Sequence, residues 1–187
     1  MDEFNNLLIT SQKPFSQLSR KEGFSNFKDL SKYVKQLPYQ RISNNNNYAL
    51  VLIEKRGTCS SKHAFLKQVA LENDFDVTLH IGIYKMYEKN TNGVGPILKK
   101  HHLSYLPEAH CYLKYNDGII DCTKESSNLE SFHHSLLIEE TILPNQTSDY
   151  KIQMHKAFLK NWITEHSISL ENDKLWQIRE QCIAAIK

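Results

Sequence analysis

Residues 109–123 decide the fold class, and they read Ala-His-Cys-Tyr-Leu-Lys-Tyr-Asn-Asp-Gly-Ile-Ile-Asp-Cys-Thr. Two short runs with apolar, β-branched and aromatic residues flank the Asn-Asp-Gly group, which is a typical turn sequence of a β-hairpin. The stretch therefore predicts two antiparallel strands, over about residues 109–115 and 119–123, joined by a tight turn.

The length of this turn determines which side chains of the hairpin share a face. A two-residue loop at Asn116-Asp117 places Asp121 opposite Tyr112, on the same face as His110 and one diagonal step away. Moving the loop by one residue keeps Asp121 and His110 on one face at a larger separation. A three-residue loop puts them on opposite faces. A His–Asp pair is therefore compatible with the sequence, and the first register suits it best.

A cysteine opens a helix upstream of the hairpin. Residues 64–71 carry a helical pattern of apolar side chains, and the sequence Arg-Gly-Thr-Cys at residues 56–59 leads into it from the apolar run at residues 49–53. Unpaired N–H groups and the helix dipole favour a thiolate at a helix N-terminus, so Cys59 is a candidate nucleophile. Gly57 allows the chain to turn sharply before it. The alternative is that Cys59 is a small buried apolar residue, which is the commonest fate of a free cysteine.

The remaining elements complete an α+β arrangement in a single domain spanning residues 1–187. Apolar residues at helical spacing predict an N-terminal helix over residues 25–37, which Pro38 ends, and two C-terminal helices over about residues 149–186. Clean alternation over residues 76–84 predicts a half-buried strand. A third short strand is predicted at residues 136–138. The stripe of Leu175, Ile178, Cys182 and Ile186 is expected to pack in the core.

A cysteine nucleophile needs a base, and the base needs a partner that orients it. His110 on the first hairpin strand and Asp121 on the second are the candidates for these two roles. His63 shares a helix face with Cys59 and competes as the base, but His110 is preferred because a base on another element can be aimed across the thiol. Gln40 and the Cys59 N–H are candidate donors to an oxyanion. The plainer alternatives are a half-buried histidine, a solvated aspartate and a surface glutamine.

Three segments, taken together, resemble the transglutaminase-like superfamily. Residues 56–66 resemble its nucleophile helix, residues 109–113 its histidine strand, and residues 120–123 its Asp-x-Thr ending. The resemblance covers about residues 50–124 and implies a papain-like core with Cys59 as nucleophile, His110 as general base and acid, and Asp121 as the orienting group. Tyr112 stands where the family often has Trp, and Cys122 where Pro is common.

Composition and charge exclude several other classes. The chain has 187 residues, 40% of them apolar and 24% charged, with a net charge of +2, so nothing favours nucleic acid or an anionic membrane as a partner. The N-terminus has no signal-peptide pattern, and a cytoplasmic location is expected. The adjacent pairs His101-His102 and His133-His134 point to opposite faces and predict no zinc site. Cys111 and Cys122 face each other in the favoured register and are expected to be buried thiols, with a disulfide as the alternative.

The sequence thus predicts thiol-dependent acyl chemistry on an amide, without a metal or an organic cofactor. Cys59 would form a thioester that is resolved by water, as in an amidase or protease, or by an amine, as in a transglutaminase. The substrate would be a peptide, a protein or a small amide. The alternative from another class is a binding or scaffold module on the same fold that has lost catalysis.

Overall fold

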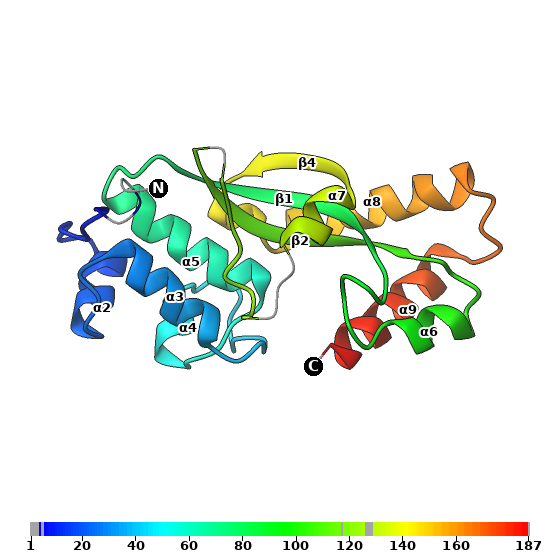
Figure 1. Ribbon diagram of the computed structural model, residues 1–187, viewed down its shortest axis with the longest axis horizontal. Helices are drawn as coiled ribbons and strands as arrows, with labels where there is room; N and C mark the ends of the chain where they lie inside the picture. Colours follow the sequence, from blue (N-terminus) through cyan, green and yellow to red (C-terminus); the bar gives the residue numbers. More distant parts are fainter. Residues whose placement is uncertain (1–3, 5, 117, 126–128, 187) are drawn as a thin grey trace. The chain divides into compact units, whose positions relative to one another are not determined.

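The computed structural model describes residues 4, 6–116, 118–125 and 129–186. It is an α+β protein with a four-stranded antiparallel sheet in the order β3-β2-β1-β4, of which Figure 1 labels β1, β2 and β4. Its labelled elements are α2 (Pro14–Lys21), α3 (Phe27–Gln36), α4 (Leu50–Ile53), α5 (Cys59–Glu72), β1 (Val77–Met86), α6 (Gly95–Lys100), β2 (Leu106–Tyr115), β3 (Gly118–Ile120), α7 (Leu129–His134), β4 (Leu136–Ile142), the 3-10 turn η1 (Pro144–Gln146), α8 (Asp149–Glu165) and α9 (Asn172–Ala185).

The chain divides into two compact units. The first contains Met1–Ile81, Cys111–Ser127 and Glu140–Ser148; the second contains Gly82–His110, Asn128–Glu139 and Asp149–Lys187. Strands β1, β2 and β4 each contribute residues to both units. The expectation of a single domain over residues 1–187 stays a prediction.

Helix α5 is the centre of the first unit. Nine of its fourteen residues are buried, on nearly every side of the helix, and α2, α3 and α4 lie beside it (Figure 1). The predicted N-terminal helix is confirmed as α3, where the Asn26 side chain accepts hydrogen bonds from the N–H groups of Lys28 and Asp29. Phe27, Leu30 and Val34 are fully buried, as the apolar spacing indicates.

Helix α2 was not predicted, because it docks through hydrogen bonds rather than an apolar stripe. Its buried residues are Ser16 and Ser19. The Glu72 carboxylate at the end of α5 accepts the Ser16 N–H at 2.6 Å and the Ser16 hydroxyl at 2.7 Å. Small polar side chains of this kind give no signal in a pattern of hydrophobicity.

The predicted hairpin and its register are confirmed. Tyr115 pairs with Gly118 and Leu113 with Ile120, so the turn has two residues, as the favoured register requires. Asn116 adopts a φ of 51°, in the left-handed region that such turns use; Asp117 lies outside the described residues. Strand β3 ends at Ile120, earlier than the predicted end at residue 123, and the chain leaves the ladder just before Asp121.

The expectation that residues 76–84 form a half-buried strand is wrong on burial. The strand is present as β1, but both of its faces are covered. On one face, the apolar side chains of Val77, Leu79, Ile81 and Ile83 are fully buried. On the other face, His80, Gly82 and Tyr84 are buried as well. The His80 ring lies flat against Tyr112 of β2, with centroids 5.8 Å apart, and its Nε2 is 2.8 Å from the Thr78 hydroxyl. A hydrogen-bonded histidine therefore fills the second face.

In the second unit, α8 and α9 confirm the predicted C-terminal helices, and α6 packs beside α9 (Figure 1). Leu175, Ile178 and Cys182 are fully buried, so these three belong to the core as expected, whereas Ile186, the fourth residue of the predicted stripe, is half-buried directly after α9. Arg179 of α9 donates two hydrogen bonds to the buried Glu108 carboxylate of β2, which anchors the helix. None of the described helices is both long enough and apolar enough to cross a lipid bilayer.

Candidate active site around Cys59

Cys59 is the first residue of α5, as the sequence predicted. Thr58 before it is extended, and its N–H donates to the Ser61 hydroxyl at 2.9 Å, which closes the first turn of the helix. The Cys59 side chain is 5% exposed, so the thiol lies at the edge of the core rather than on the open surface. The dipole of a fourteen-residue helix points its positive end at this position.

The segment before the helix is held in place by a short parallel bridge to the chain after α3. Tyr39 pairs with Gly57; the Gly57 N–H donates to the Pro38 carbonyl at 3.1 Å, and the Gln40 N–H donates to the Gly57 carbonyl at 3.2 Å. A Cβ on Gly57 would lie 2.7 Å from Cγ of Lys62, so a larger residue fits here only if the Lys62 side chain shifts. The Gln40 side chain is exposed, and its backbone N–H bonds Gly57, which precedes Cys59 by two residues. The role of Gln40 as an oxyanion donor stays a prediction.

His63 is fully buried, and both of its ring nitrogens are bonded to backbone groups. Nδ1 is 2.7 Å from the Cys59 carbonyl, which can only accept, and Nε2 is 2.7 Å from the Cys122 N–H, which can only donate. The ring is therefore neutral and carries its proton on Nδ1. Its lone pair faces Cys122, so His63 is a structural link rather than the competing base that the sequence left open.

Asp121 lies against the same helix. Its Oδ1 accepts the Thr123 N–H at 2.8 Å and lies 3.6 Å from Nε2 of His63. The distance of 3.6 Å between Oδ1 and Nε2 is too long for a hydrogen bond. An ion pair would require a proton on Nε2, and that atom already accepts the Cys122 N–H. We therefore regard the contact between Asp121 and His63 as packing. The carboxylate is 6% exposed. The Asp-x-Thr segment therefore forms a tight local turn beside α5.

Lys62 is the site residue that sequence reasoning missed. Its side chain is fully buried next to Cys59, Asp121 and Cys122, and its ammonium donates to three backbone carbonyls. Burial lowers the pKa of Lys62 from 10.5 to about 8, although Cys122, Asp121 and Cys59 act in the opposite direction. The available signal was its spacing: Lys62 precedes Leu66 by four residues and Val69 by seven, so it lies on the apolar stripe of the helix.

The two further cysteines of the hairpin are thiols. Burial raises the pKa of Cys122 to about 12, and the neighbouring Asp121 charge adds to the rise, so Cys122 stays protonated at neutral pH. Cys111 is also buried, and its sulfur lies 3.8 Å from the Ser60 hydroxyl. Cys111 and Asp121 thus each contact one of the first two turns of α5.

His110 directly precedes Cys111 in β2 and is half-buried. Its ring packs edge-on against Phe132 and Tyr84, with centroids 5.1 Å and 6.1 Å away. Cys59 and Asp121 belong to the first unit and His110 to the second, so the pairing of His110 with either of them stays a prediction.

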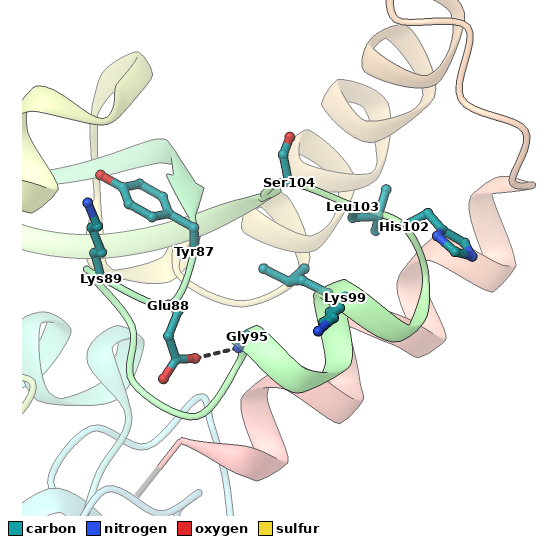
Figure 2. A pocket seen from close by; sticks show the side chains of 9 residues that line it. Tyr87, Glu88, Lys89, Gly95, Lys99, His102, Leu103 and Ser104 are labelled. Carbon is teal, nitrogen blue, oxygen red and sulfur yellow. Dashed lines mark hydrogen bonds between the residues drawn. The ribbon is translucent and has the colours of Figure 1, made fainter.

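A pocket in the second unit offers a different chemistry. It has a volume of about 740 Å³ and lies between the end of β1 and α6, as Figure 2 shows. Glu88 projects towards the start of α6, where its carboxylate accepts the N–H groups of Gly93 and Gly95. The lining includes no cysteine, and its carboxylate is occupied in bonding the N–H groups at the start of the short helix.

No three His, Cys, Asp or Glu side chains in the described part of the chain are grouped as metal ligands would be. The chain matches no protein-family model, no curated protein and no solved structure.

Proposed function

We propose that the protein has a papain-like, transglutaminase-like core and carries out thiol-dependent acyl chemistry on an amide. The observation that carries the proposal is the arrangement around the first two turns of α5, where Cys59 opens the helix and Asp121 packs 3.6 Å from His63. Strand β2, which carries His110, reaches the same helix start through Cys111, whose sulfur lies 3.8 Å from the Ser60 hydroxyl. Because side chains alternate along a strand, His110 itself leaves β2 on the opposite face. Cys59 opens a helix and His110 lies on a strand, as the resemblance implies, while Asp121 follows the end of β3.

The reaction begins when His110 takes the proton of the Cys59 thiol. The thiolate attacks the amide carbon, a C–S bond forms, and the carbonyl oxygen becomes an oxyanion that the N–H groups at the helix start can stabilise. Collapse of this intermediate breaks the C–N bond, and the imidazolium of His110 protonates the leaving amine. Asp121 orients His110 throughout.

The acyl group of the thioester is then transferred from Cys59 to water or to an amine. Water gives a carboxylic acid, and a primary amine gives a new amide; in either case His110 accepts the proton of the attacking group and the thiolate is released. The reacting groups come from Cys59, His110 and the substrate, and the substrate class is a peptide, a protein or a small amide.

An activated ester tests the proposal directly. The protein is treated with p-nitrophenyl acetate, and the acetylated residue is mapped by mass spectrometry. We expect one acetyl group on Cys59, with decay that is accelerated by a primary amine if the protein is a transferase and unaffected by it if the protein is a hydrolase. No acetyl group on Cys59 would instead favour the inactive binding or scaffold module.

A further inference from the structure

The ammonium group of Lys62 connects three segments of the first unit. Its Nζ donates to the Leu37 carbonyl at 2.6 Å and to the Thr123 carbonyl at 2.8 Å, and it lies 3.4 Å from the Lys35 carbonyl. The first and third of these belong to the end of α3, and Thr123 follows Asp121 by two residues. The helix that bears Cys59 is therefore pinned to both α3 and the Asp121 turn by one side chain.

This arrangement suits the charged form of the lysine. An ammonium has three donors and no lone pair, which matches three carbonyl acceptors, whereas a neutral amine would turn a lone pair towards one of them. A fully buried charge is costly unless it is both hydrogen-bonded and near a countercharge. Asp121 provides the negative charge, since Cys122 stays a thiol.

The groups that act on this charge come from every neighbouring segment. Asp121 and Cys122 belong to the turn after β3 and Cys59 to α5 itself. The Asp121 carboxylate, and Cys59 when it is a thiolate, interact favourably with the ammonium, whereas the Cys122 thiol carries no charge. The positive charge of Lys35, on α3, lowers the pKa of Cys122 and therefore also acts on this cluster. Because a Coulomb interaction is mutual, the ammonium that is stabilised by a Cys59 thiolate also stabilises that thiolate.

We propose that Lys62 is a positioning residue of the Cys59 site, which holds α5 against the Asp121 turn and favours the thiolate form of Cys59. The inference rests on the proposed function, because it assigns a purpose to a thiolate at Cys59. It also explains the glycine at position 57, since a side chain there would displace the Lys62 stem that it contacts. Lys62 need not touch the substrate for either effect.

The test is the pH dependence of Cys59 alkylation by iodoacetamide, followed by peptide mapping. Lys62→Gln removes the charge but keeps two N–H donors, and Lys62→Arg keeps the charge. The matched control is Lys67→Gln: Lys67 lies on the same helix and donates to the Val77 carbonyl at 2.6 Å, and burial lowers its pKa too. The charge that acts on the pKa of Lys67 is that of Asp76.

We expect the alkylation midpoint of Cys59 to rise by about one pH unit or more in Lys62→Gln, equivalent to about a tenfold slower reaction at pH 7. Lys62→Arg and Lys67→Gln should keep the midpoint of the unmutated chain. A folded Lys62→Gln protein with an unchanged midpoint overturns the inference and leaves the proposed function standing.

If Lys62→Gln does not fold, the pH dependence of Cys59 alkylation in the unmutated chain tests the inference instead. The Cys59 alkylation curve should not fit a single ionisation, because burial lowers the pKa of Lys62 into the range in which thiols titrate. A curve that fits a single ionisation overturns the inference. A Cys59 that is not alkylated at any pH overturns the proposed function, and the inference with it, so the two failures are distinguishable.

Discussion

The ring of His63 accepts a hydrogen bond from the backbone N–H of Cys122 at 2.7 Å, and this bond ties the second turn of α5 to the residue after Asp121. The same ring donates to the Cys59 carbonyl, so one neutral imidazole links the nucleophile helix to the Asp-x-Thr turn. A histidine that resembles a catalytic base in the sequence is thereby part of the scaffold that supports the site.

Replacing this histidine should destabilise the chain strongly. His63→Ala leaves a cavity and removes two buried hydrogen bonds, so we expect the free energy of unfolding to fall by about 3 kcal/mol. Urea denaturation measures the change. The matched control is His166→Ala directly after α8, where the His166 Nδ1 bonds the Trp162 carbonyl four residues earlier in the same way but at an exposed position. A similar small loss in both variants would show that the His63 bonds contribute little.

Removing the thiol should separate chemistry from stability. Cys59→Ala deletes one sulfur atom from a position at the edge of the core, so the free energy of unfolding should change by no more than about 1–2 kcal/mol. Acyl transfer should disappear completely. Thermal denaturation and the acetylation assay check the two effects. Global unfolding of Cys59→Ala would mean that Cys59 is mainly structural.

Asp121→Asn should reduce turnover more than stability. The amide oxygen can still accept the Thr123 N–H, but the negative charge that we propose orients His110, and that accompanies Lys62, is lost. We expect turnover on a responsive amide or ester to fall by at least about tenfold, less than in serine enzymes because a thiolate–imidazolium pair depends less on the carboxylate. Unchanged turnover would leave at most a Cys59–His110 dyad.

Lys62 should make stability depend on pH under alkaline conditions. Its pKa is about 8 in the folded chain and 10.5 in the unfolded chain, so between these values the unfolded chain binds more protons. The free energy of unfolding should therefore rise with pH across this window, by up to about 3 kcal/mol from this residue. Denaturation of the unmutated chain and of Lys62→Gln at pH 7.5 and 10.5 isolates the effect. Parallel pH dependences in the two proteins would exclude it.

Gly57→Ala should strain the same contact without removing the charge. The new methyl group would meet Lys62 Cγ at 2.7 Å and the Ser61 hydroxyl at 3.0 Å, and overpacking of this kind costs about 1–3 kcal/mol. The control is Gly118→Ala, where the nearest atom outside the adjacent residues is the Tyr115 carbonyl oxygen at 3.4 Å. Equal melting temperatures for both variants would show that the Lys62 stem moves aside freely.

The sequence predicted the elements that depend on local patterns. The Asn-Asp-Gly turn gave the correct register of β2 and β3, the apolar spacing from Phe27 gave α3, and Gly57 with Cys59 marked the start of α5. Each of these signals lies within a few neighbouring residues. They are therefore visible without knowledge of the tertiary structure.

The missed features depend on tertiary contacts. Ser16 of α2 is buried because it meets Glu72, which lies 56 residues away in the chain. Lys62 is buried because carbonyls from α3 and from the Asp121 turn converge on it. His63 becomes structural only where the Cys122 N–H reaches its ring. No single segment contains both partners of these contacts, so sequence pattern alone could not reveal them.

The most direct test of the Cys59–His110 pair is the rate at which p-nitrophenyl acetate acylates Cys59 in the unmutated chain and in His110→Gln. A general base contributes about a hundredfold or more, so we predict at least that fall in the variant, with Cys111, Cys122 and Cys182 unlabelled in both proteins. Equal acylation rates at Cys59 in two folded proteins, or an acetyl group on another cysteine, would contradict the account.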